Sequence, residues 1–149
     1  MLIGTYESKL VSGRRVAIPS TLRRRLGEKV ILAKWYEKCV VLVGEGQWEK
    51  LIGKLTGKVE TITRPVRDTD RFILGSAYEA IPDKQGRVVV PEVLMKHAEI
   101  KGEIVFLGLG ERVEIWDKAK WLEHELFIEE KAGDMVETLA LARLRPRDA

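Results

Sequence analysis

The chain has 149 residues, of which 45% are hydrophobic and 33% are charged, and its formal net charge is +3 at pH 7. This length suits one ordinary domain or two very small ones, and the apolar content excludes disorder throughout. No apolar run approaches the roughly 18 residues of a membrane helix, and the N-terminal segment lacks a secretory-signal pattern. We therefore expect no membrane partner. Because Cys39 is the single cysteine, we also expect a protein of the reducing cytoplasm.

The first half of the chain predicts short strands and two helices. Residues 15–18 alternate in polarity like a half-buried strand, and Pro19 ends that strand and suits the first turn of a helix. Gly27 is a typical residue at a helix C-terminus. The predicted elements are a strand at 15–18, a helix at Ser20–Leu26, a β-branched strand pair at Lys29–Lys34 and Lys38–Val43, and a helix at Gln47–Leu55.

The second half predicts a similar series after a linker at Gly57–Arg67 and a short helix at Asp68–Leu74. Its later elements are a strand at Arg87–Val90, a helix at Pro91–His97, and strands at Glu103–Leu107 and Arg112–Trp116. Asp117 is a good N-cap for a helix through Phe127, which we expect Gly133 to break. Met135–Leu144 is then a second amphipathic segment.

These two series are copies of one unit. Residues 15–19 align with residues 87–91, and Trp48 aligns with Trp121. A unit of about 45 residues buries too little apolar surface to be stable by itself. Two copies become stable if they intertwine about a pseudo-twofold axis. We therefore expect an α+β, mainly β fold, with the repeats forming one intertwined β-barrel and C-terminal helices following it.

The second copy carries a recognisable motif. Asp83-Lys84-Gln85-Gly86-Arg87-Val88-Val89-Val90-Pro91 resembles the signature of AbrB/SpoVT swapped-hairpin domains. Two such domains in tandem, with residues 108–117 and then Trp121, resemble the MraZ family over most of the chain. The resemblance implies a first SpoVT-AbrB repeat at residues 5–48, a second at residues 77–121, and a C-terminal helical segment at residues 122–149.

The resemblance also implies a function. Members of this family are bacterial, sequence-specific DNA-binding transcriptional regulators of the division and cell-wall gene cluster promoter, which includes their own gene. The implied assembly is a nucleoid-associated, ring-shaped homo-oligomer of about eight to twelve subunits on repeated short boxes of double-stranded DNA. The alternative classes are an AbrB-type protein-binding module, as in an antitoxin, and an oligomeric scaffold without DNA binding.

The charge distribution fits a nucleic-acid partner. Residues 1–67 contain 14 Lys and Arg against 6 Asp and Glu, whereas residues 68–149 contain 12 against 17. Arginine holds phosphates and reads guanine edges in the major groove. The predicted DNA contacts are Lys9, Arg14, Arg15, Arg23 and Arg24. Helical spacing prevents Arg23, Arg24 and Arg25 from sharing one face, and a solvated C-terminal cluster is the alternative for all three.

The first motif departs from the family pattern. Val11 stands where the family has Asp, and Arg14 stands where it has Gly, while Gly13 lies one place early and re-forms the turn. In the second motif, Lys84 and Arg87 either contact DNA or are neutralised by acids. Arg87 has a specific alternative, which is to pair with Asp83 and fix the turn.

Catalytic patterns are absent from the sequence. His97, His124 and Cys39 have no metal-ligand spacing, and no phosphate-binding loop is present, so we expect no enzyme, metal, cofactor or small-molecule ligand.

The apolar residues of the C-terminal segment are candidates for a subunit interface or for the core, and the core is favoured for any single one. These candidates are Leu122, Leu126, Met135, Val136 and Leu139.

Overall fold

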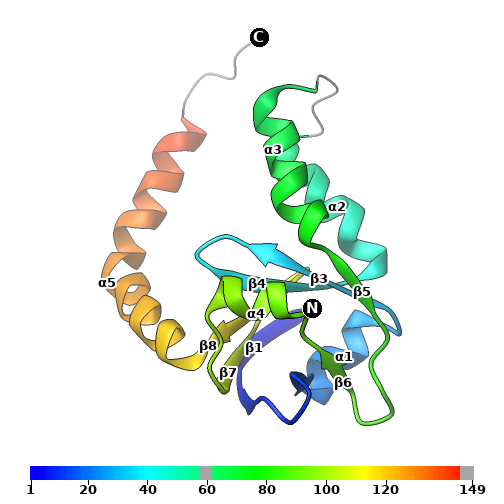
Figure 1. The fold of residues 1–149 in the computed structure, drawn as a ribbon. Helices are drawn as coiled ribbons and strands as arrows, with labels where there is room; N and C mark the ends of the chain where they lie inside the picture. The colour runs from blue at the N-terminus through cyan, green and yellow to red at the C-terminus, as the bar shows by residue number, and fades with distance from the viewer. Residues whose placement is uncertain (58–61, 145–149) are drawn as a thin grey trace. The chain divides into compact units, whose positions relative to one another are not determined.

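The computed structural model describes residues 1–57 and 62–144 (Figure 1). The chain divides into two compact units, Met1–Lys118 and Ala119–Ala149, which are described separately. In the first unit the elements are β1 (Leu2–Lys9), β2 (Arg15–Ala17), α1 (Ser20–Leu26), β3 (Val30–Trp35), β4 (Cys39–Gly44), α2 (Glu45–Thr56), α3 (Arg64–Ile73), the 3-10 helix η1 (Leu74–Ser76), β5 (Tyr78–Ala80), β6 (Arg87–Val89), α4 (Glu92–Ala98), β7 (Glu103–Gly110) and β8 (Val113–Asp117). Helix α5 (Lys118–Arg143) continues from there into the second unit.

The strands form two antiparallel sheets. Six of them make one sheet in the order β1-β7-β8-β4-β3-β5, and β2 pairs with β6 in a separate two-stranded ribbon. Every ladder in both sheets is antiparallel. The pairing therefore joins strands from the two ends of the first unit, and the chain segments interleave instead of forming two separate lobes.

The ladders follow the internal duplication. Edge strand β1 of the first copy pairs with β7 of the second, and reciprocally β5 of the second copy pairs with β3 of the first. Central strands β4 and β8 pair with each other, and the ribbon is centred on Val16 opposite Val88. Val16 and Val88 are equivalent in the sequence alignment, so a pseudo-twofold axis passes between them.

The expected closed barrel is not what the structure shows. Across the parts of the chain that the structure describes, no ladder joins edge strand β1 to edge strand β5, and none joins the ribbon to the large sheet. The ribbon strands have three residues each, and Pro19 and Pro91 end them, so they are too short to reach both edges. Helices α1 and α4 supply the remaining cover.

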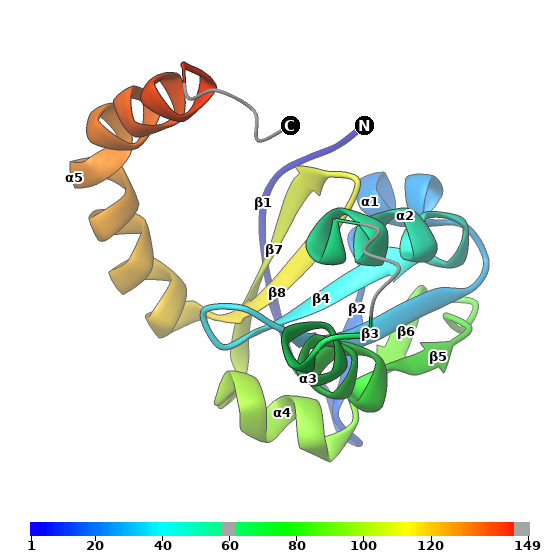
Figure 2. The same cartoon turned by 90° about the horizontal axis from the view of Figure 1, so that it is seen from above.

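The main core lies between the six-stranded sheet and the ribbon. Sheet residues such as Leu32, Leu42 and Phe106 pack there against the ribbon residues Val16 and Val88. Helix α1 contributes Leu22 and Leu26 to this core, and its equivalent α4 contributes Leu94 and Ala98. Helices α2 and α3 stand side by side on the opposite face of the sheet (Figures 1 and 2). The ribbon and α3 are thus separated by the sheet.

Most predicted boundaries agree with the structure to within a few residues, but two helices differ. The linker was placed too far along the chain, because α3 begins at Arg64, with Pro65 in its first turn. Proline is well tolerated there because its missing N–H has no partner in the first turn. Residues 58–61 of the predicted linker lie outside the described residues.

The expected break at Gly133 was also wrong. Helix α5 is continuous from Lys118 to Arg143, so Met135–Leu144 is not a separate segment. One glycine inside a helix costs about 1 kcal/mol relative to alanine, which the good helix formers on both sides offset. The helix curves along its length (Figures 1 and 2).

Candidate nucleic-acid interface

The β2–β6 ribbon places two arginines on one solvent-facing surface. Val16 and Val88 point into the core, so alternation along the strands sends Arg15 and Arg87 to the other face of the ribbon. Both arginines line one cavity of about 400 Å³ beside the ribbon, together with the exposed Val89. The ribbon therefore acts as a platform that aligns two guanidinium groups along one surface.

The turn of the first repeat re-forms without its aspartate. Val11 and Arg15 exchange backbone hydrogen bonds, and Gly13 and Arg14 both adopt positive φ, at 78° and 56°. The Nε–H of Arg15 donates to the carbonyl oxygen of Ser12 at 3.0 Å. This bond orients the guanidinium and leaves its terminal amino groups available to a phosphate or a base.

The turn of the second repeat uses the aspartate instead. Asp83 Oδ1 accepts from the backbone N–H groups of Gln85 and Arg87, each at 2.9 Å, and Oδ2 accepts from Arg87 Nε at 2.9 Å. The pKa of Asp83 lies below its ordinary value, chiefly because the backbone N–H of Arg87 donates to the carboxylate. Arg87 thus has the turn-fixing arrangement, and its charge is partly neutralised, unlike that of Arg15.

Helix α1 extends the basic surface across the boundary between the repeats. A Cβ built on Gly86, where φ is +76°, would overlap the guanidinium of Arg23, so that guanidinium lies directly on the second turn. Arg24 lines a neighbouring groove with Pro82 and Asp83. Arg25 is exposed and does not line this groove, which fits the expectation that the three arginines cannot share one face.

The two turns obtain their second arginine from different elements of the structure. By the pseudo-twofold relation, Arg14 is equivalent to Gly86, and Met95 on α4 is equivalent to Arg23 on α1. The carbonyl oxygens of Arg14 and Gly86 accept equivalent backbone bonds, from Val90 and Ile18. Arg14 and Met95 line one groove. At the equivalent place in the other half, the guanidinium of Arg23 covers Gly86. Each turn therefore has a guanidinium beside it, from the turn itself in the first repeat and from α1 in the second.

Most of these cations have no acidic partner. Within residues 1–57 and 62–144, no carboxylate lies within ion-pair distance of the predicted contacts Lys9, Arg14, Arg15, Arg23, Arg24 and Lys84. Lys9 stands opposite Glu103 in the β1–β7 ladder, but the two side chains form no such pair. Unpaired cations near one ribbon make a surface suited to a polyanion.

The apolar residues of α5 are not core residues. No residue of this helix is buried, and Leu122, Leu126 and Leu139 are 48%, 69% and 59% exposed. The core assignment favoured from the sequence was therefore wrong for these side chains, because none of them is buried. These side chains remain candidates for a contact between subunits.

Other chemistry is limited in the described part of the chain. It contains no cluster of three metal-ligating side chains and no helix long and apolar enough to cross a bilayer. Cys39 is buried, and burial raises the pKa of its thiol. Sequence reasoning missed the contact of Arg23 with Gly86, for which the sequence carries no local signal because the two residues come from different repeats.

Comparison with known proteins identifies the family. A family model described as "MraZ protein, putative antitoxin-like" matches residues 73–140. The transcriptional regulator MraZ of Caldanaerobacter subterraneus subsp. tengcongensis is 39% identical over 125 residues, which cover 83% of this chain and 86% of that protein. The protein of the same name from Clostridium acetobutylicum is 40% identical over 124 residues, or 83% and 87% of the two chains. That of Oenococcus oeni is 32% identical over 139 residues, or 93% and 96%. With this similarity along most of its length, the chain belongs to the MraZ family.

Proposed function

We propose that this chain is a sequence-specific DNA-binding transcriptional regulator that acts as a homo-oligomer. The observation that carries the proposal is the set of unpaired cations around the β2–β6 ribbon, in particular Arg15. Among the described residues its guanidinium is held through Nε alone, so a bidentate contact to a guanine or a phosphate remains open to it. The three relatives described above are named transcriptional regulators, which supports the regulatory part of this proposal.

The finer parts of the proposal come from the family resemblance. They are the promoter of the division and cell-wall gene cluster as the target, repeated short boxes, a ring of about eight to twelve subunits, and association with the nucleoid in the cytoplasm. Repeated boxes suit a multivalent protein, because each further contact is intramolecular and raises the overall avidity. We also retain the swapped-hairpin repeats at residues 5–48 and 77–121 as the DNA-binding units.

The experiment is selection of DNA from a random pool, followed by binding of the selected site and a scrambled site. Arg15→Ala is expected to weaken binding by about 1–3 kcal/mol per contacted site if Arg15 reads a base, and to relax discrimination between the two sites. If Arg15 holds a phosphate, affinity falls evenly on both sites, and the salt slope falls by about 0.9 for each phosphate that the variant no longer neutralises.

Arg15→Lys is the matched control, because it keeps the charge and removes the planar fork. A phosphate contact survives this substitution better than a bidentate base contact. Unchanged affinity and salt slope in a folded Arg15→Ala variant would contradict the assignment of Arg15 to the interface. Failure of the wild type to enrich any sequence would favour the antitoxin-like or scaffold alternatives.

A further inference from the structure

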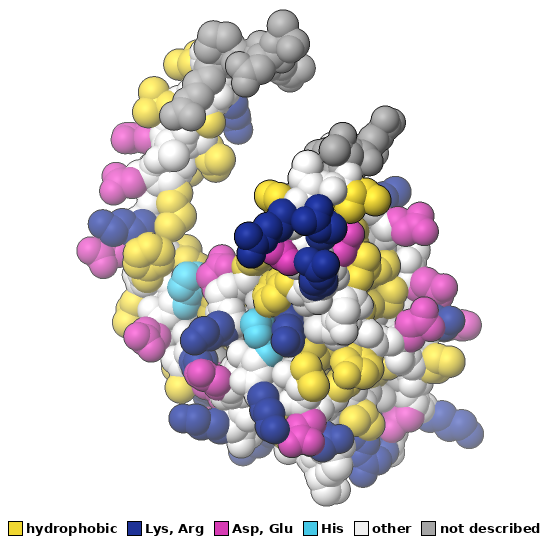
Figure 3. All heavy atoms as spheres, turned by 45° about the horizontal axis from the view of Figure 1, so that its top comes forward, with side chains coloured by type: hydrophobic (Ala, Val, Ile, Leu, Met, Phe, Trp, Pro, Cys, Tyr) yellow, Lys and Arg dark blue, Asp and Glu magenta, His cyan; other side chains and the backbone are white. Residues whose placement is uncertain are grey.

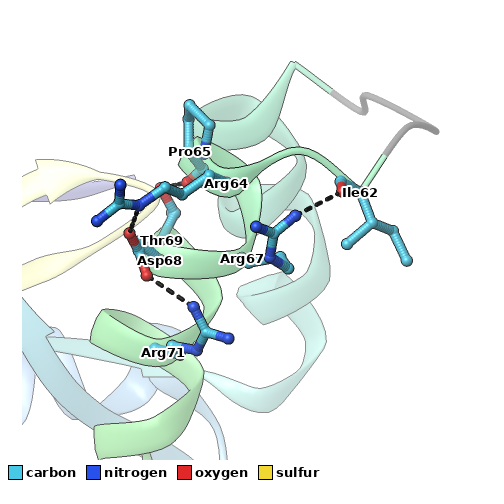
Figure 4. Close-up of polar contacts among 7 residues, drawn as sticks. All are labelled: Ile62, Arg64, Pro65, Arg67, Asp68, Thr69 and Arg71. Atoms are coloured by element: carbon cyan, nitrogen blue, oxygen red, sulfur yellow. Dashed lines mark hydrogen bonds and ion pairs between the residues drawn. The ribbon is translucent and has the colours of Figure 1, made fainter.

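Helix α3 carries a row of arginines on its exposed face. Arg64, Arg67 and Arg71 follow the spacing that places side chains on one side of a helix, and we call them the α3 arginine stripe. Asp68 lies within the stripe (Figure 4), with Oδ1 2.8 Å from an Arg71 amino group and Oδ2 3.4 Å from Arg64 Nε. Arg67 donates to the carbonyl oxygen of Ile62 at 3.0 Å.

The stripe has more positive charge than its surroundings neutralise. One carboxylate serves two of its three guanidinium groups, and the side chains of Arg64 and Arg71 are 83% and 68% exposed. Asp70, on the flank of the same helix, forms no ion pair with any described residue. Figure 3 shows basic side chains gathered around acidic ones where the helices project from the sheet. The ribbon lies on the other face of the sheet (Figure 2), so the stripe does not belong to the proposed DNA interface.

Helix α5 carries the complementary pattern. Among residues 121–140 of the sequence there are six acidic residues and one lysine. Four of the acids share one side of the helix by their spacing, namely Glu123, Glu130, Asp134 and Glu137. No residue of α5 is buried, and the residues of this acidic face are exposed.

The two rows match in spacing when the helices run antiparallel. The steps from Arg71 to Arg67 and Arg64 are four and three residues, and the steps from Glu130 to Asp134 and Glu137 are also four and three. At about 1.5 Å of rise per residue, three charges on each helix then lie level with one another.

We propose that α5 of a second copy docks antiparallel along α3, with Glu130 opposite Arg71, Asp134 opposite Arg67 and Glu137 opposite Arg64. This inference deepens the homo-oligomer of the proposed function and rests on it. Exposed ion pairs contribute little individually, so apolar contacts have to supplement them. In the proposed register Phe127, 50% exposed, meets Leu74, 45% exposed, and Ile62, 71% exposed, lies at the end where α5 presents Leu141.

The test reverses one charge on each helix and measures mass in solution without DNA. Arg67→Glu is chosen because its partner is a backbone carbonyl, so the change leaves no carboxylate unpaired. We expect the wild type to have a mass of two or more chains by light scattering at micromolar concentration. We expect Arg67→Glu and Asp134→Arg each to shift the mass towards the 17.0 kDa of one chain, with at least a tenfold weaker association.

Mixing the two variants distinguishes contacts between copies from contacts within one chain. In an equimolar mixture, each variant meets the other through a pair of opposite charges, so the wild-type mass returns. Lys50→Glu on α2 and Glu129→Arg on another side of α5 make the same charge changes away from the contact, and they keep the wild-type mass. Circular dichroism confirms that each variant is folded.

Several outcomes would overturn the inference. They are a wild-type mass of one chain, single variants that keep the wild-type mass, and a mixture that does not recover it. If the wild-type mass returned in the Arg67→Glu, Asp134→Arg double variant but not in the mixture, the contact would be between α3 and α5 of the same chain. Loss of DNA affinity at unchanged mass would assign the stripe to nucleic acid. Failure of the proposed function is separate, because Arg15→Ala tests DNA binding on the other face of the sheet.

Discussion

Replacing Gly86 with alanine tests whether the second turn positions Arg23. The residue has a φ of +76°, and a left-handed conformation costs a residue with a Cβ roughly 1–2 kcal/mol. The new Cβ also overlaps the Arg23 guanidinium, which is the far end of a flexible side chain and can move away. We therefore expect the free energy of unfolding to fall by about 1–2 kcal/mol, and Arg23 to lose its place beside the turn.

Two measurements separate these effects. Urea unfolding gives the change in stability. A loss of about 1–2 kcal/mol corresponds to a fall of about 2–8 °C in Tm for a chain of this size. DNA binding at a temperature where the variant is folded gives the effect on Arg23, and we expect it to resemble that of Arg23→Ala. Gly75→Ala is the control, because a Cβ there meets no atom within 4 Å and φ is not positive.

Equal stability of Gly86→Ala and Gly75→Ala would refute the backbone argument. If Gly86→Ala lost stability but bound DNA like the wild type, while Arg23→Ala bound weakly, the contact between Arg23 and the turn would have no role in binding. Combining Gly86→Ala with Arg23→Ala shows whether the two sites act together, since coupled sites are not additive.

The remaining predictions concern three other sites. Arg87→Ala is expected to reduce DNA affinity less than Arg15→Ala, because Arg87 is paired with Asp83, and equal losses in folded variants would contradict this. Because the pKa of Asp83 is lowered on folding, its stabilisation is present above its unfolded value of about 3.9 and is lost as the pH falls through the folded value. Urea unfolding should therefore show a smaller acid-induced loss for Asp83→Asn than for the wild type. Cys39 should resist a thiol reagent until the protein is unfolded, because its thiol is buried and its pKa is raised, and rapid labelling of the native protein would disprove this.

Local patterns in the sequence predicted most elements of each repeat, but they missed the edge strands β1 and β5. Helix α1 has the predicted bounds, Ser20–Leu26, because Pro19 and Gly27 are strong signals at its two ends. Strands β3 and β4 are long β-branched runs, and they begin and end within a residue of the prediction. In α3 and α5 single prolines and glycines were given too much weight, since Pro65 lies in the first turn and Gly133 inside a helix.

Contacts between the repeats were beyond the reach of local patterns. The alignment of the two copies indicated intertwining, but it does not specify whether ladders close into a barrel, which depends on strand length and on the helices between them. The predicted cations lie around the ribbon and its turns, yet the position of Arg23 on Gly86 follows from tertiary packing alone. The α3 arginine stripe was missed because the helix was predicted to begin at Asp68, which left Arg64 and Arg67 in the linker.

The ladders that join equivalent strands of the two copies have a consequence for how the protein evolves. If a single copy formed this ribbon, it would have to do so as a dimer of identical chains, whose exact symmetry confines it to palindromic targets. Fusion places both halves in one polypeptide, so the fold does not depend on subunit concentration and each half can mutate independently. The groove that Arg14 and Met95 line in one half, and the contact of Arg23 with Gly86 in the other, are signs of that divergence. The backbone keeps its twofold symmetry, but the side chains on its two halves now differ. The surface is therefore asymmetric, and it would have a defined direction along any duplex that it contacts.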